Sequence, residues 1–391
     1  MSAAADIDQD LSSLLSRDEW PLRWQRKLHL LPNSGMGLAR RALLYALVTW
    51  VPVAAWALLT GHALPGHDAE PLITHFGVTV RCLVAIPLFV LAEGSVLRAT
   101  VNMVRQFIQN GLVTEAQLDK FATLLRVVAR LRDSSLPWVI LFGLVLSWTI
   151  VNRADPTIDA LSWAEEPTGS LGFGGWWFAY IARPVFLALV LGWLWRIVLI
   201  LILFSRIATL DLSLVPTHPD RAGGLGFLEM YPGAFALVTL ALSAVIGSGW
   251  AHDIVFHGER VESLTPLLAA FAVVWSLIVL SPLLVFAPTL MAAKRQAKME
   301  YSRVVGEHGR NVRRRWVLNE PVDDEALDPP GIGPIADAVS LYDAVIAMRF
   351  APIGKASLIA ILVPLLVPMI AVFAIQIPVK TLLMQLFKAL M

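Results

Sequence analysis

Long apolar stretches alternate with short polar ones along most of the chain. Seven apolar stretches are long enough, at a rise of 1.5 Å per residue, to cross a hydrocarbon layer of about 30 Å as helices. They are residues 41–61, 74–96, 136–152, 176–206, 227–250, 264–291 and 356–377. The pattern therefore predicts an all-α fold, a polytopic transmembrane helical bundle of about seven spans, with six to eight as the range.

The composition agrees with a membrane protein. Hydrophobic residues make up 57% of the 391 and charged residues 16%, whereas an ordinary soluble chain carries about 25% charged residues. The first forty residues contain no apolar segment of the signal-peptide kind, so we expect the first span to direct membrane insertion. The single cysteine, Cys82, excludes an intrachain disulfide and a cysteine-based metal site.

The distribution of lysine and arginine predicts the orientation. With a cytoplasmic N-terminus, 24 of the 31 Lys and Arg residues fall in cytoplasmic segments, counting Arg41 and Arg206 at the inner ends of their spans, and four fall in outer segments. The remaining three, Arg81, Arg183 and Arg196, fall inside spans. Because positive residues are enriched on the cytoplasmic side, we expect the C-terminus outside. The expected location is a cell membrane, specifically a bacterial cytoplasmic (inner) membrane.

The polar segments divide the chain into four parts. Residues 1–40 are predicted to be cytoplasmic, with an amphipathic helix at the bilayer interface. Residues 41–291 form a membrane domain with spans 1–6 and cytoplasmic amphipathic helices at 98–134. Residues 292–355 are a cytoplasmic segment with a basic run, expected to meet anionic lipid headgroups, and an acidic linker. Residues 356–391 are the last span and an amphipathic tail.

Charged residues inside spans are costly, so each needs a structural or functional reason. Arg81 and Arg183 are predicted to lie at the same level in the outer half of the membrane, with Glu93 in the inner half. One interpretation is structural: Arg196 pairs with Glu93 or Glu229, and the two outer arginines reach lipid phosphates. In the other interpretation the three arginines line a cavity that attracts an anion.

The segment 216-PTHPDRAGGLGFLEMYPG-233 has more polar chemistry than a turn requires. Its polar and glycine residues are His218, Asp220, Arg221, Gly223, Gly224, Gly226 and Glu229. Glycines at a helix start, with an adjacent arginine, can form an anion-binding cradle of N–H groups. Three interpretations remain: a structural helix-entry turn, a cytoplasmic gate or anion site, and a docking surface.

Histidines are concentrated in two outer loops. They are His62, His67 and His75 in the first and His252 and His257 in the second. Imidazoles beside carboxylates can bind zinc or copper, but the spacing matches no helical metal motif. Solvated loops are the expected state, with a metal site as the weaker alternative.

The residues favour transport over catalysis. We find no zinc-protease, nucleophile-elbow or nucleotide-loop motif, so no cofactor is expected and a membrane-embedded enzyme is the third hypothesis. The first is a channel or transporter for a small solute or anion. The second is a non-transporting membrane subunit or sensor that binds a cytoplasmic partner. The bilayer, a small anion and a second copy of the chain are the partners considered; nucleic acid is not.

Overall fold

The computed structural model describes residues 37–64, 71–151, 159–166, 168–322 and 333–376. Seven helical stretches in this part of the chain are long and apolar enough to cross a membrane, as the sequence pattern predicted. The expected interfacial helix before residue 37 and the amphipathic tail after residue 376 lie outside the described residues, as does His67. The fold is all-α, and the only pairing of β type among the described residues is one isolated bridge.

The first four spans include long helices with interruptions. The elements are α3 (Leu38–Thr60), η1 (Leu72–Thr74), α4 (Phe76–Val80), η2 (Arg81–Ala85), α5 (Ile86–Gln109), η3 (Glu115–Gln117), α6 (Leu118–Asp133), α7 (Leu136–Val151), η4 (Asp159–Ala164), α8 (Phe173–Trp177), η5 (Phe178–Ala182) and α9 (Arg183–Ala208). Helices α4 and α5 with η2 form one span, and α8 and α9 with η5 form another.

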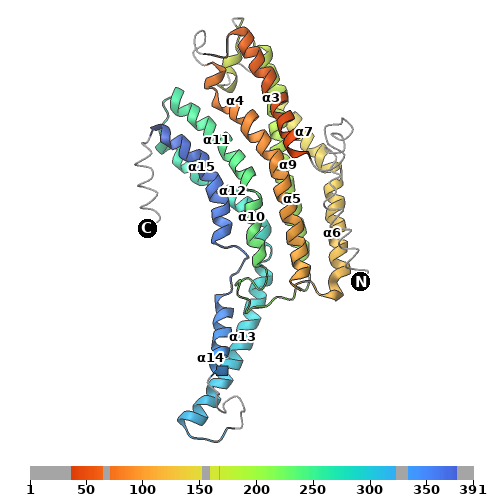
Figure 1. Cartoon of the computed structure of the whole chain (residues 1–391), viewed down its shortest axis with the longest axis vertical. Coiled ribbons are helices and arrows are strands. Elements are labelled where there is room, and N and C mark those ends of the chain that lie inside the picture. The colour runs from red at the N-terminus through yellow and green to blue at the C-terminus, as the bar shows by residue number, and fades with distance from the viewer. Residues whose placement is uncertain (1–36, 65–70, 152–158, 167, 323–332, 377–391) are drawn as a thin grey trace.

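The second half contains three spans and a helical hairpin. Its elements are η6 (Gly226–Met230), α10 (Tyr231–Ala234), α11 (Ala236–Phe256), α12 (Val261–Leu284), α13 (Ala287–Val312), η7 (Arg313–Val317), α14 (Gly333–Ala347) and α15 (Lys355–Gln376). Helix α3 packs on α5, α11 on α15 and α5, and α12 on α9. Helices α13 and α14 pack on each other and project away from the bundle (Figure 1).

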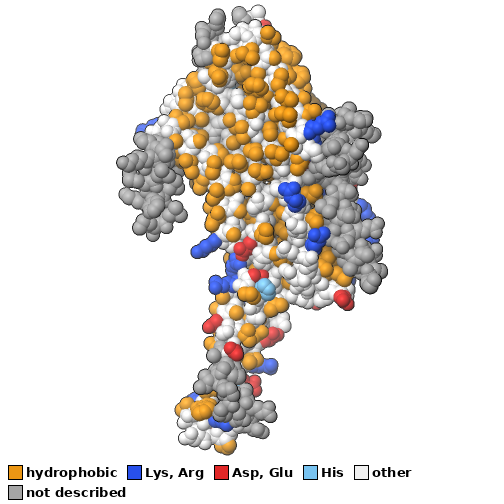
Figure 2. Space-filling model, viewed as in Figure 1, with side chains coloured by type: hydrophobic (Ala, Val, Ile, Leu, Met, Phe, Trp, Pro, Cys, Tyr) orange, Lys and Arg blue, Asp and Glu red, His pale blue; other side chains and the backbone are white. Residues whose placement is uncertain are grey.

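Hydrophobic and charged side chains lie on different parts of the surface. Hydrophobic side chains cover the visible face of the spanning bundle, whereas most of the charged side chains in this view lie around its lower end and along the α13–α14 hairpin (Figure 2). An apolar band of this kind faces lipid in a membrane protein. On one side of this band α3 and α7 begin at Leu38 and Leu136, α12 ends at Leu284 and α15 begins at Lys355; we call this side inner, after the predicted orientation.

Two spans contain a π-helical turn at the same distance from a proline. The turn η2 ends two residues before Pro87, and η5 ends two residues before Pro184. Proline has no N–H to donate to the preceding turn, so the helix must adjust its hydrogen bonding there. π-Turns inside α-helices are rare and are frequent at functional sites. The two turns place Arg81 and Arg183 at their edges.

The end of the bundle next to the α13–α14 hairpin is held by an aromatic core. The rings of Phe107 and Phe204 lie 6.0 and 5.6 Å from that of Phe286, measured between centroids. All three side chains are fully buried. Helices α5 and α9 therefore stay packed to their last turns, and the residue that precedes α13 is fixed to them.

One expected boundary differs from the structure. The sixth span ends at Leu284, not at residue 291, because Pro288 lies in the first turn of the separate helix α13; proline is favoured there, since its missing N–H would have no partner. The basic run, residues 310–316, begins in the last turn of α13 and continues into η7; α13 is 26 residues long and so about 39 Å in length. The headgroup contact expected for that run stays a prediction.

Candidate anion site

Glu93 joins three helices near the inner end of the spans. Its Oε2 accepts a hydrogen bond from Arg41 Nη1 at 2.7 Å, and its Oε1 accepts one from Arg196 Nη2 at 3.0 Å. The Arg41 and Glu93 side chains are buried, and Arg196 also lies over the Trp193 ring at 4.7 Å. One carboxylate thus ties α3 and α9 to α5.

The sequence identified only part of this network. The pairing of Arg196 with Glu93 was one of two alternatives, and the structure selects it. Arg41 was assigned to the cytoplasmic segment, but α3 begins at Leu38 and carries Arg41 into the bundle in its first turn. Its neighbour Arg40 is exposed. Two adjacent arginines at a span boundary give no sequence signal for which one is buried.

Arg81 and Arg183 lie together in the outer part of the bundle. Each guanidinium carbon is 5.5 Å from the centroid of the Phe178 ring, and that of Arg81 is also 5.3 Å from the Phe186 ring. The sequence interpretation placed them at the same level, and the structure brings them to one ring.

The helix geometry gives the position of this pair along the spans. Arg81 precedes Glu93 by 12 residues and Arg183 precedes Arg196 by 13, which corresponds to about 18 and 20 Å along the helices. The pair therefore lies about 18–20 Å outward of Glu93 and Arg196, within the second and fourth spans. Isolated arginines within spans are rare and mark functional positions.

A cavity of about 330 Å³ opens beside the two arginines. Its lining comes from three spans: η2, the η5–α9 region and α7. The lining residues are Arg81, Trp148, Thr149, Ala179, Arg183, Pro184, Phe186 and Leu187. Within the described part of the chain, neither arginine forms an ion pair, and Arg81 Nε is buried without a hydrogen-bond partner. We call this space the outer arginine pocket.

The electrostatics of the pocket favour an anion. Two like charges lie on aromatic faces, which stabilise a guanidinium but do not neutralise it. A buried cation without a counter-charge is costly, and that cost is offset when an anion supplies charge-assisted hydrogen bonds. Arg196 pairs with Glu93 in the Arg41–Glu93–Arg196 network, which we call the inner network. The structure therefore does not bring all three intramembrane arginines into one cavity.

The N–H groups of the glycine-rich 216–233 segment bind a carboxylate of the same segment. Asp220 Oδ1 accepts hydrogen bonds from the N–H of Ala222 at 2.7 Å and of Gly224 at 3.2 Å, and Oδ2 accepts one from Gly226 at 2.7 Å. A Cβ on Gly226 would lie 2.6 Å from that of Asp220. The N–H cradle expected for an anion therefore binds Asp220, and His218 lies 2.9 Å from the same carboxylate.

Positive backbone φ angles explain the glycines of this loop. Gly223 and Gly224 have φ of +66° and +96°, and Arg221 has φ of +56°. Glycine adopts this left-handed region without the steric cost that a side chain carries. The Arg221 carbonyl accepts a hydrogen bond from the Arg349 N–H at 2.7 Å. This part of the stretch supports the interpretation as a structural turn.

Arg349 joins the 216–230 segment to the chain between α14 and α15, and the sequence did not reveal this role. Its Nη2 donates to the Asp220 carbonyl at 2.7 Å and also pairs with Glu229, while Nη1 donates to the Ile353 carbonyl at 3.0 Å. Glu229 therefore pairs with Arg349 and not with Arg196. The contacts of Arg349 with Asp220 and Glu229 cross more than a hundred residues of sequence.

The outer histidines form contacts without forming a metal centre. The His75 and His252 rings stack with centroids 4.8 Å apart, His62 stacks on Trp56, and His257 Nδ1 lies 3.8 Å from Asp253. The two loops do meet through His75 and His252, which are both buried. Among the residues that the structure describes, no group of three or more metal-binding side chains gathers.

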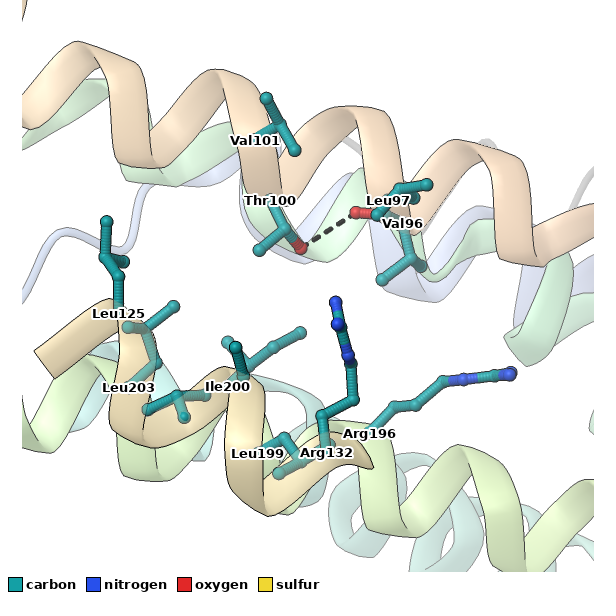
Figure 3. A pocket seen from close by; sticks show the side chains of 12 residues that line it. Val96, Leu97, Thr100, Val101, Leu125, Arg132, Arg196, Leu199, Ile200 and Leu203 are labelled. Atoms are coloured by element: carbon teal, nitrogen blue, oxygen red, sulfur yellow. Dashed lines mark hydrogen bonds between the residues drawn. The ribbon is translucent and has the colours of Figure 1, made fainter. Parts of the chain in front are cut away.

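A second, apolar pocket of about 90 Å³ lies below the inner network. Figure 3 shows Thr100 and Val101 of α5 on one side of it, Leu125 and Leu203 on the other, and two arginines at one end. The Thr100 hydroxyl donates to the Val96 carbonyl of its own helix at 2.8 Å. This leaves an aliphatic space without the uncompensated charge of the outer arginine pocket.

Comparison of the chain with protein-family models, curated protein sequences and solved structures gave no match. The class follows from the fold itself: seven apolar helices with a lipid-facing surface define a multi-pass integral membrane protein.

Replacement of Glu93 by Gln should destabilise the protein strongly. The variant keeps the shape of the side chain but leaves two buried arginines without a counter-charge, a loss of about 3–5 kcal/mol for a buried pair. We expect a lower midpoint of thermal unfolding in detergent. Glu262→Gln is the matched control, because its pair with Arg260 is exposed. Equal midpoints for the two variants would contradict a stabilising role of Glu93.

The Asp220 carboxylate should make stability depend on pH. Burial alone would raise its pKa, but the N–H groups of Ala222, Gly226 and Gly224 and the His218 ring together hold the pKa below the ordinary value of 3.8. A group with a lowered folded-state pKa contributes stability that is present above its unfolded pKa and is lost as the pH falls through the folded pKa.

The measurement is the unfolding midpoint of Asp220→Asn and of the parent protein against pH. We expect the variant to be less stable at neutral pH and the difference to shrink below pH 3.8. Asp211→Asn, on the exposed part of the same loop, should match the parent protein throughout. A difference between parent and Asp220→Asn that stays constant with pH would rule out the carboxylate as its source.

Proposed function

We propose that the protein passes an anionic group across the membrane and that the outer arginine pocket is its binding site. The observation that carries this proposal is the charge of that pocket. Arg81 and Arg183 lie against one phenylalanine ring, line a cavity of about 330 Å³ and form no ion pair with a described residue. An anion between them would supply the missing charge.

The inner network would close such a path on its inner side. Glu93 binds Arg41 of α3 and Arg196 of α9 from its position on α5. These contacts hold three spans together about 18–20 Å inward of the pocket. An anion that moved inward could replace Glu93 as the partner of either arginine, because guanidinium groups bind carboxylates and other oxyanions with similar geometry. The network would then act as an inner gate.

The interrupted helices support movement at the level of the pocket. Both arginines lie at the edges of π-turns that precede prolines. Broken helices with unpaired backbone groups are a common construction at transporter binding sites. A change in the hydrogen bonding of either π-turn would rotate its arginine relative to the cavity. The proposed path thus contains a part of the backbone that can move its binding residues.

Flux through reconstituted liposomes tests this function. We compare chloride, inorganic phosphate, a small carboxylate and a fluorescent anionic phospholipid in the parent protein and in the Arg81→Gln/Arg183→Gln variant. We expect the variant to move the preferred anion at least ~10-fold more slowly, since charge-assisted hydrogen bonds contribute about 1.5–3 kcal/mol each.

Arg260→Gln is the control for this experiment, because Arg260 is an exposed arginine of the outer loop region. It should leave the flux unchanged. If no anion in the panel moves faster through the parent protein than through the double variant, passage of an anion is excluded for this panel, and the pocket has another role.

The projecting hairpin favours a second function, a membrane subunit that binds a cytoplasmic protein. Lys294 Nζ donates to the carbonyls of Ile346 at 2.8 Å and of Met348 at 2.5 Å, which fixes α13 to the end of α14. Further out, apolar side chains of α13 such as Met299 and Val304 are exposed. An exposed helical pair of this kind can dock a partner through its apolar positions.

Cross-linking tests this second function. A cysteine at the exposed Ser302 of α13, in a Cys82→Ser background, is treated with a bifunctional reagent in native membranes. A partner on the hairpin should give a defined heavier adduct. A cysteine at Ser263, at the outer start of α12, is the control. The absence of an adduct specific to position 302 would count against a docked subunit.

A further inference from the structure

We infer that the anion of the outer arginine pocket is the phosphate group of an anionic phospholipid, which enters sideways from the outer leaflet. This inference rests on the proposed function and names its substrate class. It depends on three properties of the pocket: its position beside α7, the donors that line it and its net charge.

The pocket borders the exposed side of α7. One side of it is formed by Trp148 and Thr149 of α7, a helix that packs mainly on α9 and is otherwise largely exposed. Thr149 is 13 residues from the start of α7 at Leu136, or about 20 Å, which is the level of the two arginines. Thr149 also lies two residues before the end of α7 at Val151, so the pocket is near the outer end of this span. A ligand that enters there from the exposed side of α7 comes from the lipid.

The donors fit a tetrahedral oxyanion. A guanidinium carries five N–H donors in a planar fork that matches phosphate oxygens in pairs. The rings of Phe178 and Phe186 lie 5.5 and 5.3 Å from the Arg81 guanidinium carbon, and its Nε has no hydrogen-bond partner in the described part of the chain. Two such groups can enclose one phosphate from two sides.

The size of the pocket favours an organic phosphate over a simple ion. Its volume of about 330 Å³ lies in the ~300–1,000 Å³ range of sites for organic ligands, which is more space than a single halide fills. Apolar groups, Leu187, Pro184 and Ala179, make up much of the remaining wall. A phosphate flanked by a glycerol backbone and acyl chains would meet both kinds of lining.

The net charge favours an anionic lipid. Two guanidinium groups face the cavity, and no described carboxylate lines it. A phosphate diester with a neutral headgroup brings one negative charge, whereas a choline headgroup brings a positive charge that the arginines repel. Phosphatidylglycerol should therefore bind better than phosphatidylcholine, and diacylglycerol, which has no phosphate, should not be retained.

The test measures ligand retention by the full chain in an uncharged detergent. Phosphatidylglycerol, phosphatidylcholine and diacylglycerol are titrated separately, with retention read by native mass spectrometry, and inorganic phosphate is titrated by equilibrium dialysis. We expect one phosphatidylglycerol per chain with a Kd ~10-fold below that for phosphatidylcholine, a difference of about 1.4 kcal/mol. Inorganic phosphate should bind at least as weakly as phosphatidylcholine.

Two variants separate the site from general destabilisation. Arg81→Gln/Arg183→Gln removes the charge, and Thr149→Phe fills the cavity from α7 while both arginines stay in place. Each should weaken phosphatidylglycerol binding at least ~10-fold, about 1.4 kcal/mol or more, whereas Arg260→Gln should not change it. If the arginine variant does not fold, Thr149→Phe still decides the result.

The other outcomes have distinct meanings. Inorganic phosphate bound more tightly than phosphatidylglycerol, with sensitivity to the two arginines, would overturn the lipid inference and leave an anion path in place. Phosphatidylglycerol bound with no sensitivity to Arg81, Arg183 or Thr149 would place the lipid elsewhere and overturn the inference. No anion bound in a manner that depends on the two arginines would overturn both the inference and the proposed function.

Discussion

The cost of keeping a guanidinium in a layer without water governs the arrangement of this bundle. Near the inner end, the cost is met by Glu93, which binds Arg41 and Arg196 and so joins α3, α5 and α9. In the outer half, Arg81 and Arg183 meet aromatic faces and a cavity instead of a described carboxylate. A carboxylate of the chain thus neutralises the arginines at one level, whereas the arginines at the other level have no described counter-charge.

The outer arginine pocket lies at the level of the irregular parts of the helices. The π-turns η2 and η5 lie beside each other in the bundle and contain or adjoin both arginines. A regular helix would give these side chains another rotation about its axis. The prolines that follow at equal distances, Pro87 and Pro184, are therefore part of the construction of the pocket, since they force the change in backbone hydrogen bonding.

The sequence predicted the class of fold well because the period and length of apolar runs depend only on the thickness of the hydrocarbon layer. It also predicted that Arg81 and Arg183 lie at one level and that Glu93 is an alternative partner of Arg196. It could not predict Arg41 or Arg349 as partners, because both contacts join segments distant in sequence. The segment around Asp220 was ambiguous for a related reason: glycine N–H groups can bind a ligand or a carboxylate of the same loop, and only the structure shows that Asp220 turns inward.

The central claim is that Arg81 and Arg183 share one bound phosphate. The most direct measurement is an electron cryo-microscopy map of the protein in nanodiscs of phosphatidylglycerol. We predict density for a phosphate between the two guanidinium groups, continuous with acyl-chain density that leaves the bundle past Trp148. A map in which the space between them is occupied by a carboxylate of the chain, or in which both arginines turn out to the headgroup region, would contradict the account.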